Sequence, residues 1–275
     1  MQKKIAVIND LSGYGRCSLT VAIPVLSVMG HQCCPVPTAI LSNHTEFPVY
    51  FFDDYTEKMT TYTDKWKELG LSFDAIATGF LGSEAQIGIV MEIVQKLKAE
   101  KTFVVVDPVM GDHGHAYETY TPEMCEQMKE LVCMADIVLP NVTECCILTD
   151  TPYKKENWTR RELLNMAMML RLMGAKSVVI TGVREGSYYT NVVLERGQME
   201  AKFIRTRSSG GERPGTGDVF SSVVAGALLN GKSLPEAVAQ AAGFVKECIK
   251  VSDEEQIPHA NGVCFEKILG KLIKK

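Results

Sequence analysis

The stretch that decides the fold is GERPGTGDVFSSVVAGALLNGKS, residues 211–233, which contains two glycine patterns able to hold a phosphate. Residues 226–233 read G-x-x-x-x-G-K-S, the P-loop consensus, in which a glycine-rich loop connects a strand to a helix. Here, however, apolar residues recur at helical spacing from Val219 to Leu228, through the middle of the match. We therefore predict one amphipathic helix that ends at Asn230-Gly231, with Ser233 capping the next helix. The P-loop match is interpreted as accidental.

The second pattern, Gly215-Thr216-Gly217-Asp218, stands where that helix should begin. The first turn of a helix has free N–H groups and the positive end of the helix dipole, which together favour an anion. Asp218 could simply cap the helix. Its carboxylate could instead accept the proton of an attacking hydroxyl while the amides of residues 215–217 hold a phosphoryl group. The motif alone leaves both interpretations open.

Short apolar runs alternate with longer amphipathic segments along most of the chain. Because a strand buried on both faces reads as a continuous apolar run, we predict strands at 4–10, 32–41, 74–80, 103–109, 136–141 and 177–183. Helices are predicted at 83–100 (with Ser83 as N-cap), 121–135 and 159–175, and from near residues 216, 234 and 262. Residues 186–206 read as antiparallel strands with a turn at 196–197. The alternation predicts one α/β domain over residues 1–275, a three-layer α/β/α sandwich with a mostly parallel central sheet and antiparallel edge strands.

Three polar residues follow predicted parallel strands. Asp107, Asn141 and Thr181 each stand at the carboxyl end of one strand. Open α/β sheets bind ligands in the crevice outside these strand ends. Any one of the three could serve only as a helix cap or turn residue, but the set together indicates a ligand site.

The overall composition excludes several classes of function. The formal net charge is −4, so no basic field attracts nucleic acid or an anionic membrane surface. The N-terminal apolar run is too short for a signal peptide, and no apolar run has the length of a membrane span. We expect a cytoplasmic protein. The nine cysteines include the adjacent pairs 33–34 and 145–146 within apolar runs and no C-x-x-C, which favours reduced core cysteines.

Several further stretches, together with residues 215–218, resemble the vitamin B6 (pyridoxal, pyridoxine and pyridoxamine) kinases of the ribokinase-like superfamily. They cover nearly the whole chain and lie at residues 9–20, 40–45, 78–83, 105–112, 135–144 and 178–182. The SNHT sequence at 42–45 is the most specific to this group, whereas GTGD and DPVMGD are shared more widely. The resemblance implies the ribokinase-like fold, a homodimer, and ATP-dependent phosphorylation of the 5′-hydroxymethyl group of a B6 vitamer.

The resemblance also implies roles for individual residues. Asp218 would be the general base, with the amides of Gly215, Thr216 and Gly217 as the anion hole. Asp107 and Glu144 would organise Mg²⁺ through water, since Mg²⁺ keeps much of its hydration shell. The residues implied to contact the B6 substrate are Ser12, His44, Thr45 and Phe80, the last at a position where many relatives have tyrosine. The residues implied to lie near the nucleotide are Tyr120, Asn141, Thr181 and Thr216.

Some positions depart from the pattern of these kinases. Glu46 follows Thr45 where many relatives have glycine, so the shape of the substrate loop is left open. Leu139 stands where some relatives place a threonine beside a monovalent cation, which puts K⁺ dependence in doubt. His113 and His115 lack a third close ligand in the sequence, so we interpret residues 111–120 as a flap over the nucleotide rather than a zinc site.

Two other functions are compatible with the fold. A hydroxymethylpyrimidine kinase of thiamine synthesis usually has a cysteine after G-T-G, so Asp218 and SNHT favour a B6 substrate. A non-catalytic vitamer-binding protein would not need a base and metal-organising acids together, so Asp107, Glu144 and Asp218 count against it.

Overall fold

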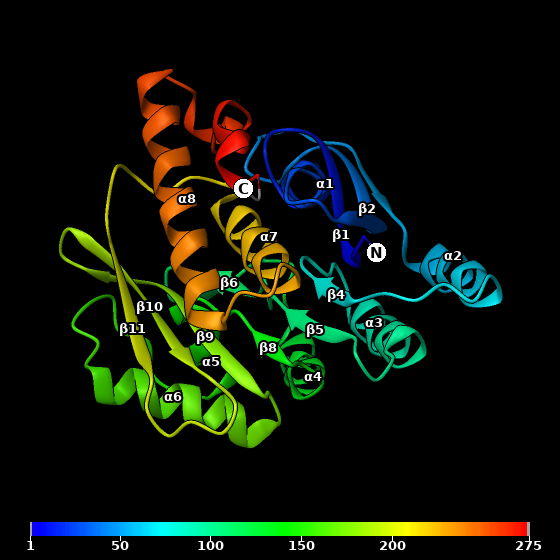
Figure 1. Ribbon diagram of the computed structural model, residues 1–275, viewed down its shortest axis with the longest axis horizontal. Helices are drawn as coiled ribbons and strands as arrows, with labels where there is room; N and C mark the ends of the chain where they lie inside the picture. Colours follow the sequence, from blue (N-terminus) through cyan, green and yellow to red (C-terminus); the bar gives the residue numbers. More distant parts are fainter. Residues whose placement is uncertain (1, 274–275) are drawn as a thin grey trace.

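A nine-stranded sheet forms the middle of the protein in this computed structural model, which describes residues 2–273 (Figure 1). The strand order is β11-β10-β9-β8-β5-β4-β1-β2-β3. The pairs from β2 through β1, β4, β5 and β8 to β9 are parallel, whereas β3 and the β10–β11 pair are antiparallel at the two edges. The strands are β1 (Lys4–Tyr14), β2 (Gln32–Asn43), β3 (Phe52–Asp54), β4 (Ala75–Thr78), β5 (Phe103–Val106), β8 (Ile137–Val138), β9 (Ser177–Glu185), β10 (Tyr188–Leu194) and β11 (Lys202–Arg207).

Helices cover both faces of this sheet (Figure 1). Alternate residues of a strand point to opposite faces, so Ile5 and Val7 of β1 enter one core while Ala6 and Ile8 enter the other. The first core is shared with α1 (Ser18–Val28), α7 (Thr216–Leu229) and α8 (Leu234–Glu254). The second is shared with α2 (Thr56–Glu68), α3 (Glu84–Leu97), α4 (Pro122–Cys133), α5 (Val142–Leu148) and α6 (Arg160–Met173). The predicted three-layer sandwich is confirmed.

The strongest sequence patterns correspond to real elements. Each predicted apolar run contains a strand, residues 186–206 contain the β10–β11 pair, and Ser83 caps α3 by accepting from the Gln86 amide. The P-loop consensus lies within α7 and the turn after it, where Gly231 has a φ of 85°. Ser233 and Glu236 then form a capping box that begins α8. The accidental nature of the P-loop match is confirmed.

The prediction of a helix from near residue 262 is wrong. Gly262 has a φ of 74°, and the chain turns there between two 3₁₀ helices, η1 (His259–Asn261) and η2 (Glu266–Leu272). We also did not predict α1, α2, α5 or β3. Helix α1 is almost uniformly apolar and contains Pro24, so it lacks both the alternation of polar and apolar faces and the composition typical of a helix.

Two observations bear on the environment of the protein. No helix within residues 2–273 is both long and apolar enough to cross a membrane. The cysteines of the described residues are free. Five of them are buried, as predicted for core residues, namely Cys17, Cys145, Cys146, Cys248 and Cys264, whereas Cys33, Cys34 and Cys125 are only partly buried and Cys133 is exposed.

Candidate active site

The site is built at the carboxyl ends of the parallel strands. Asn9 lies where β1 loses its regular register, Asp107 follows β5, and Asn141 pairs with Thr181 in an isolated parallel bridge beyond β8. Because these strands are parallel, their ends share one edge of the sheet. The predicted grouping of Asp107, Asn141 and Thr181 is therefore confirmed.

Helix α7 begins above this edge with the Gly215–Asp218 turn. Gly215 is the N-cap residue, with a left-handed backbone (φ 75°), and its carbonyl accepts the first helical hydrogen bond from the Val219 amide at 3.0 Å. The amides of Thr216, Gly217 and Asp218 precede that bond, so they have no partner within the helix. The turn therefore presents free N–H groups at the positive end of α7, the arrangement that favours an anion.

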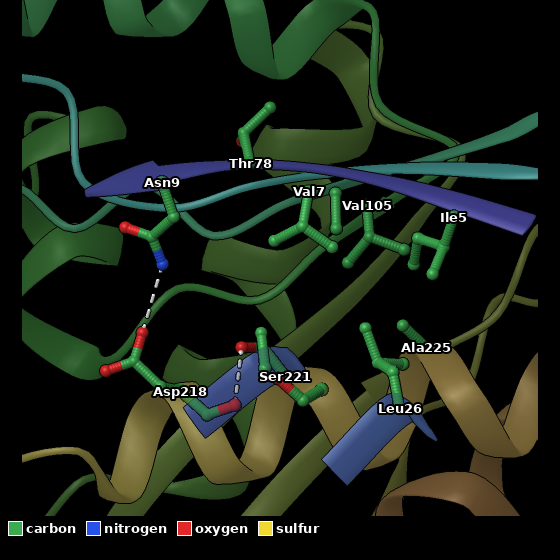
Figure 2. A pocket seen from close by; sticks show the side chains of 12 residues that line it. Ile5, Val7, Asn9, Leu26, Thr78, Val105, Asp218, Ser221 and Ala225 are labelled. Carbon is green, nitrogen blue, oxygen red and sulfur yellow. Dashed lines mark hydrogen bonds between the residues drawn. The ribbon is translucent and has the colours of Figure 1, made fainter. Parts of the chain in front are cut away.

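Asp218 does not cap this helix. Its side chain faces β1, where Asn9 Nδ2 donates to Asp218 Oδ1 at 3.2 Å (Figure 2). The Ser18 backbone amide, in the first turn of α1, also donates to this carboxylate. Of the two interpretations that the motif left open, helix capping is thus excluded by the geometry.

Burial raises the pKa of Asp218 to about 6, and the nearby Asp10 carboxyl adds to the increase. The Ser18 amide and the Asn9 carboxamide act in the opposite direction, because they bind the ionised form. A carboxylate with a pKa near working pH is suited to accept a proton from an alcohol.

Two further acids lie beside this turn, of which Glu144 is buried and Asp107 is half-buried. Burial is the main cause that raises the pKa of Asp107 well above its usual range, and the charges of Glu144 and Asp218 raise it further. Burial likewise raises the pKa of Glu144 to about 7. Glu144 is held rigidly: its Oε2 accepts from the Asn141 amide at 2.8 Å and its Oε1 from the Met110 amide at 3.0 Å.

These acids fit a hard divalent cation. Oxygen ligands are the type that Mg²⁺ prefers, and a carboxylate whose pKa is raised by a neighbouring carboxylate gains from a nearby positive charge. Ser221 on α7 also hydrogen-bonds Asp107. The chemistry of Asp107 and Glu144 thus suits Mg²⁺, and their role as metal-organising residues stays a prediction.

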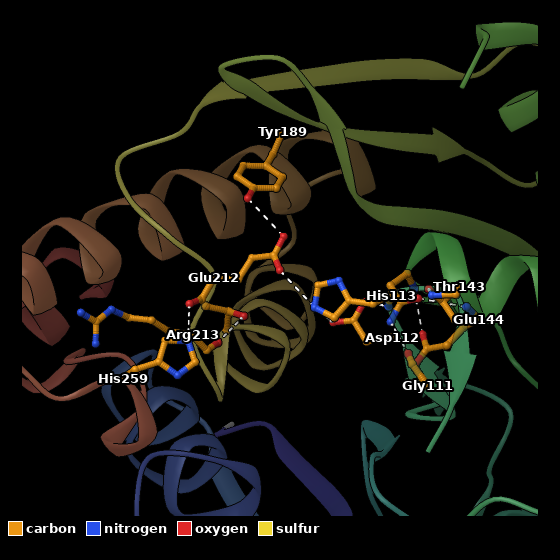
Figure 3. A network of polar contacts seen from close by, with 12 residues as sticks. Gly111, Asp112, His113, Thr143, Glu144, Tyr189, Glu212, Arg213 and His259 are labelled. Carbon is orange, nitrogen blue, oxygen red and sulfur yellow. Dashed lines mark hydrogen bonds and ion pairs between the residues drawn. The ribbon is translucent and has the colours of Figure 1, made fainter. Parts of the chain in front are cut away.

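A short hairpin, β6 (Gly111–Asp112) and β7 (His115–Ala116), projects beside these acids. It is anchored to α5, since Asn141 Nδ2 donates to the Gly111 carbonyl at 2.8 Å and the Gly114 amide donates to Thr143 Oγ1 at 2.9 Å. Its tip reaches the loop before α7, where His113 Nε2 lies 3.5 Å from Glu212 Oε2 (Figure 3). Asp112, His113 and Glu212 are all exposed, and their contacts join the hairpin to the loop before α7.

The residues predicted to contact the substrate lie on the β1 and β2 side of the site. Ser12 is fully buried and donates to Asp10 Oδ2 at 2.9 Å, whereas Thr45 is exposed. His44 Nε2 lies 2.7 Å from the Ala260 carbonyl. Phe80 is partly exposed, and its amide donates to Asn9 Oδ1 at 2.9 Å. Their roles toward a substrate stay predictions.

The residues predicted near the nucleotide divide into two groups. Asn141, Thr181 and Thr216 lie around the strand ends and the α7 turn, with Thr216 Oγ1 donating to the Arg213 carbonyl at 3.0 Å. Tyr120 is instead buried beneath the hairpin, and its hydroxyl donates to the Pro108 carbonyl at 3.3 Å. Tyr117 is the exposed tyrosine next to the hairpin. Contact between Tyr120 and a nucleotide stays a prediction that this burial does not favour.

An open pocket of about 370 Å³ lies beside the same loop. It is lined by residues of the β9–β10 turn and of the segment before α7, namely Arg184, Gly186, Ser187, Tyr189, Ser208, Gly210, Gly211 and Glu212. Tyr189 donates to Glu212 Oε1 at 3.3 Å (Figure 3). The last lining residues of this pocket, Gly210 to Glu212, directly precede the segment that leads into the Gly215–Asp218 turn.

Four residues of the site were missed in the sequence: Asn9, Asp10, Ser18 and Ser221. Asn9-Asp10 directly follows the apolar run of β1, just as Asp107 follows that of β5. The same rule that selected Asp107 could therefore have selected them. Ser18 and Ser221 carry no comparable signal, because their contacts depend on how α1 and α7 are docked.

The fold, with acids gathered beside a helix N-terminus, is that of a small-molecule kinase with the ribokinase-like architecture. The chain belongs to the phosphomethylpyrimidine kinase family, whose model matches residues 23–264. A Bacteroides thetaiotaomicron protein, provisionally classed as such a kinase and crystallised with pyridoxal, is 40% identical, with a TM-score of 0.94 over 99% of this chain and 96% of that one.

Two characterised groups of enzymes are represented among the relatives. The pyridoxine kinase of Bacillus subtilis is 28% identical over 262 residues, which cover 92% of this chain and 85% of that protein. The hydroxymethylpyrimidine/phosphomethylpyrimidine kinase of Aquifex aeolicus is 32% identical over 174 residues, which cover 62% of this chain and 66% of that protein. Both groups are kinases, which disfavours a non-catalytic binding protein.

Proposed function

We propose that this protein is an ATP-dependent kinase of the 5′-hydroxymethyl group of a vitamin B6 vitamer (pyridoxal, pyridoxine or pyridoxamine). The observation that carries the proposal is the half-buried Asp218, whose carboxylate has a raised pKa and lies in the first turn of α7 beside the free amides. A base next to an anion site is what phosphoryl transfer to an alcohol requires. The relatives that act on B6 vitamers and the SNHT sequence favour this substrate class.

In this mechanism Asp218 accepts the proton of the hydroxymethyl group as its oxygen attacks the γ-phosphorus of ATP. The bond from that phosphorus to the bridging oxygen breaks, and ADP leaves. The amides of residues 215–217, at the N-terminus of α7, would stabilise the charge on the transferring group. Asp107 and Glu144 would hold Mg²⁺, which when bound neutralises phosphate charge.

We place the nucleoside of ATP in the pocket lined by Arg184, Tyr189 and Glu212. From there the phosphates can reach the α7 turn near Thr216, with Asn141 and Thr181 on the facing strand ends. Leu139 is buried and its side chain offers no oxygen ligand, so the structure gives a K⁺ requirement no support at that position. A homodimer remains part of the proposal on the resemblance alone.

Hydroxymethylpyrimidine is the second candidate substrate, because the family model and the Aquifex aeolicus relative point to it. An ADP-release assay with Mg²⁺-ATP decides between the two, run in parallel on pyridoxal, pyridoxine, pyridoxamine and hydroxymethylpyrimidine. Turnover on a B6 vitamer supports the proposal. Turnover on the pyrimidine alone keeps the mechanism and replaces the substrate.

The acid side of the pH–rate profile should report Asp218. Its pKa is raised to about 6 in the free protein, so below that pH the protonated form accumulates and cannot accept the substrate proton. We expect kcat/KM for the vitamer to fall about tenfold per pH unit below about pH 6. Glu144, with a pKa raised to about 7, titrates nearby. An acid limb that moves with Mg²⁺ concentration would belong to Glu144 and would contradict the assignment to Asp218.

The β6–β7 hairpin should act as a flap over the nucleotide. Replacing residues 112–115 with two glycines removes the contact between His113 and Glu212, which joins the hairpin to the loop before α7. We expect KM for ATP to rise several-fold. The matched control shortens the β10–β11 turn at residues 196–199, which lies at the opposite end of β9 from the site. An unchanged KM for ATP in the hairpin variant would rule out a flap.

A further inference from the structure

Asn9 lies within β1, just before the register of the strand shifts, and every polar atom of its side chain is hydrogen-bonded. It is 6% exposed. Its Oδ1 accepts from the Phe80 amide at 2.9 Å and from the Asp10 amide at 3.0 Å, and its Nδ2 donates to Asp218 Oδ1 at 3.2 Å (Figure 2). This one carboxamide therefore joins β1, the loop after β4 and the first turn of α7.

The orientation of this carboxamide is dictated by its partners. An amide oxygen accepts and an amide nitrogen donates, so two backbone N–H groups on one side require Oδ1 there. Nδ2 must then point to Asp218. A flipped amide would place N–H against N–H and an oxygen against a carboxylate, which loses all three bonds.

Gly79 preserves the space that this arrangement needs. A Cβ atom built on Gly79 would lie 2.4 Å from Asn9 Nδ2 and 2.5 Å from its Cγ, closer than any real contact. The Gly79 amide meanwhile donates to the Ile8 carbonyl at 2.9 Å, which fixes the loop against β1. Gly79 therefore packs directly against the Asn9 carboxamide, where no side chain would fit.

We propose that Asn9 is a positioning residue that holds the Asp218 carboxylate in one orientation and favours its ionised form. The inference rests on the proposed function, in which Asp218 is the base. Asn9 itself does not contact the substrate in this proposal, because it acts on the reaction only through Asp218.

The neighbouring charges make this donor important. The Asp10 carboxyl of β1 raises the pKa of Asp218. Asp218 in turn raises the pKa of Asp107 after β5. The charge of Asp218 also raises the pKa of Cys17 before α1 and of Tyr117 after the hairpin. Because burial is the main cause that raises both pKa values, both side chains are neutral at working pH. Asn9 and the Ser18 amide are the donors that oppose this negative environment.

Two variants test the proposal through the pH profile of kcat/KM. Asn9→Leu removes the donor, and we expect the acid limb to move up by about one pH unit. Asn9→Asp is nearly isosteric and keeps the acceptor for the Phe80 and Asp10 amides, yet it puts a second carboxylate against Asp218. Its limb should move further, because the two acids then share one proton.

The matched control is Asn230→Asp at the other end of α7, where the side chain donates to the Met29 backbone carbonyl at 3.1 Å. The acid limb of this control should coincide with that of the wild type. In Asn9→Asp the limb moves only if the side chain at position 9 lies against Asp218, whereas the shift in Asn9→Leu reports how far the wild-type donor favours the ionised form of Asp218. An unmoved limb in Asn9→Asp would overturn the proposal, whether or not Asn9→Leu folds.

A direct titration separates this inference from the proposed function. The ¹³C carboxyl resonance of Asp218, assigned by its loss in Asp218→Asn, reports the pKa without any turnover. If that pKa rises in Asn9→Leu while the wild-type rate has no acid limb, Asn9 positions Asp218 but Asp218 is not the base. If the pKa of Asp218 does not move, the inference fails even where the kinase assignment stands.

Discussion

Replacing Asp218 with asparagine should lower kcat by about 10²- to 10⁴-fold, the usual contribution of a general base. Asparagine has the same shape and can still accept a hydrogen bond from Asn9 Nδ2 through its own oxygen. It cannot take up the hydroxyl proton. KM for ATP should therefore change little, because the amides of the α7 turn remain in place.

The measurement is the coupled ADP-release assay on the preferred vitamer, with nucleotide binding followed separately by calorimetry. Asp64→Asn on α2 is a suitable control, since that aspartate pairs with Lys96 far from the α7 turn. Turnover near the wild-type rate would remove Asp218 from the mechanism. Loss of turnover together with loss of ATP binding would indicate a structural role instead.

The same variant has a second expected effect, on stability. Burial raises the pKa of Asp218 from 3.8 to about 6, so between these values the folded protein binds more protons than the unfolded chain. Stability contributed by this group is present at low pH and is lost as pH rises through about 6. Each pKa unit corresponds to about 1.4 kcal/mol. Asp218→Asn should thus unfold at higher urea concentration than the wild type at pH 7.5, and the difference should vanish near pH 4.

Much of this site could be predicted from the sequence by locating the carboxyl ends of the strands. Continuous apolar runs located β1, β4, β5, β8 and β9, and the polar residue after a run then marked the ligand edge of the sheet. Asp107, Asn141 and Thr181 were found in this way because parallel pairing brings strand ends together whatever the details of packing. The Gly215–Asp218 turn was found because glycines before an amphipathic pattern predict a helix N-terminus.

Other features depend on contacts that no local pattern encodes. Asn9 and Asp218 are 209 positions apart in the sequence. Their contact depends on how the first turn of α7 packs against β1. Ser12 lies in the right strand but points into the interior toward Asp10, since the register of β1 shifts between Asn9 and Leu11. Burial of Tyr120 rather than Tyr117 likewise depends on where the hairpin meets α4.

Gly215→Ala should abolish most of the activity and also destabilise the fold. The residue has a φ of 75°, which costs an L-residue about 1–2 kcal/mol. In addition, a Cβ atom there would lie 1.8 Å from the Arg16 carbonyl oxygen, so the backbone of one segment must move. That movement displaces the α7 amides and Asp218 from the segment that leads into α1. A displacement of about 1 Å in such a site can cost about 10²-fold in rate.

Gly231→Ala separates the two causes, because it lies at the other end of the same helix. Its φ of 85° imposes the same backbone strain, yet a Cβ atom there would meet nothing within 4 Å. We expect a comparable loss of stability from strain alone, measured by urea unfolding, with kcat close to the wild-type value. If Gly231→Ala lost activity as severely as Gly215→Ala, global destabilisation would explain both results. If Gly215→Ala kept its activity, the close approach of Gly215 to the Arg16 carbonyl would not be needed to position the α7 amides.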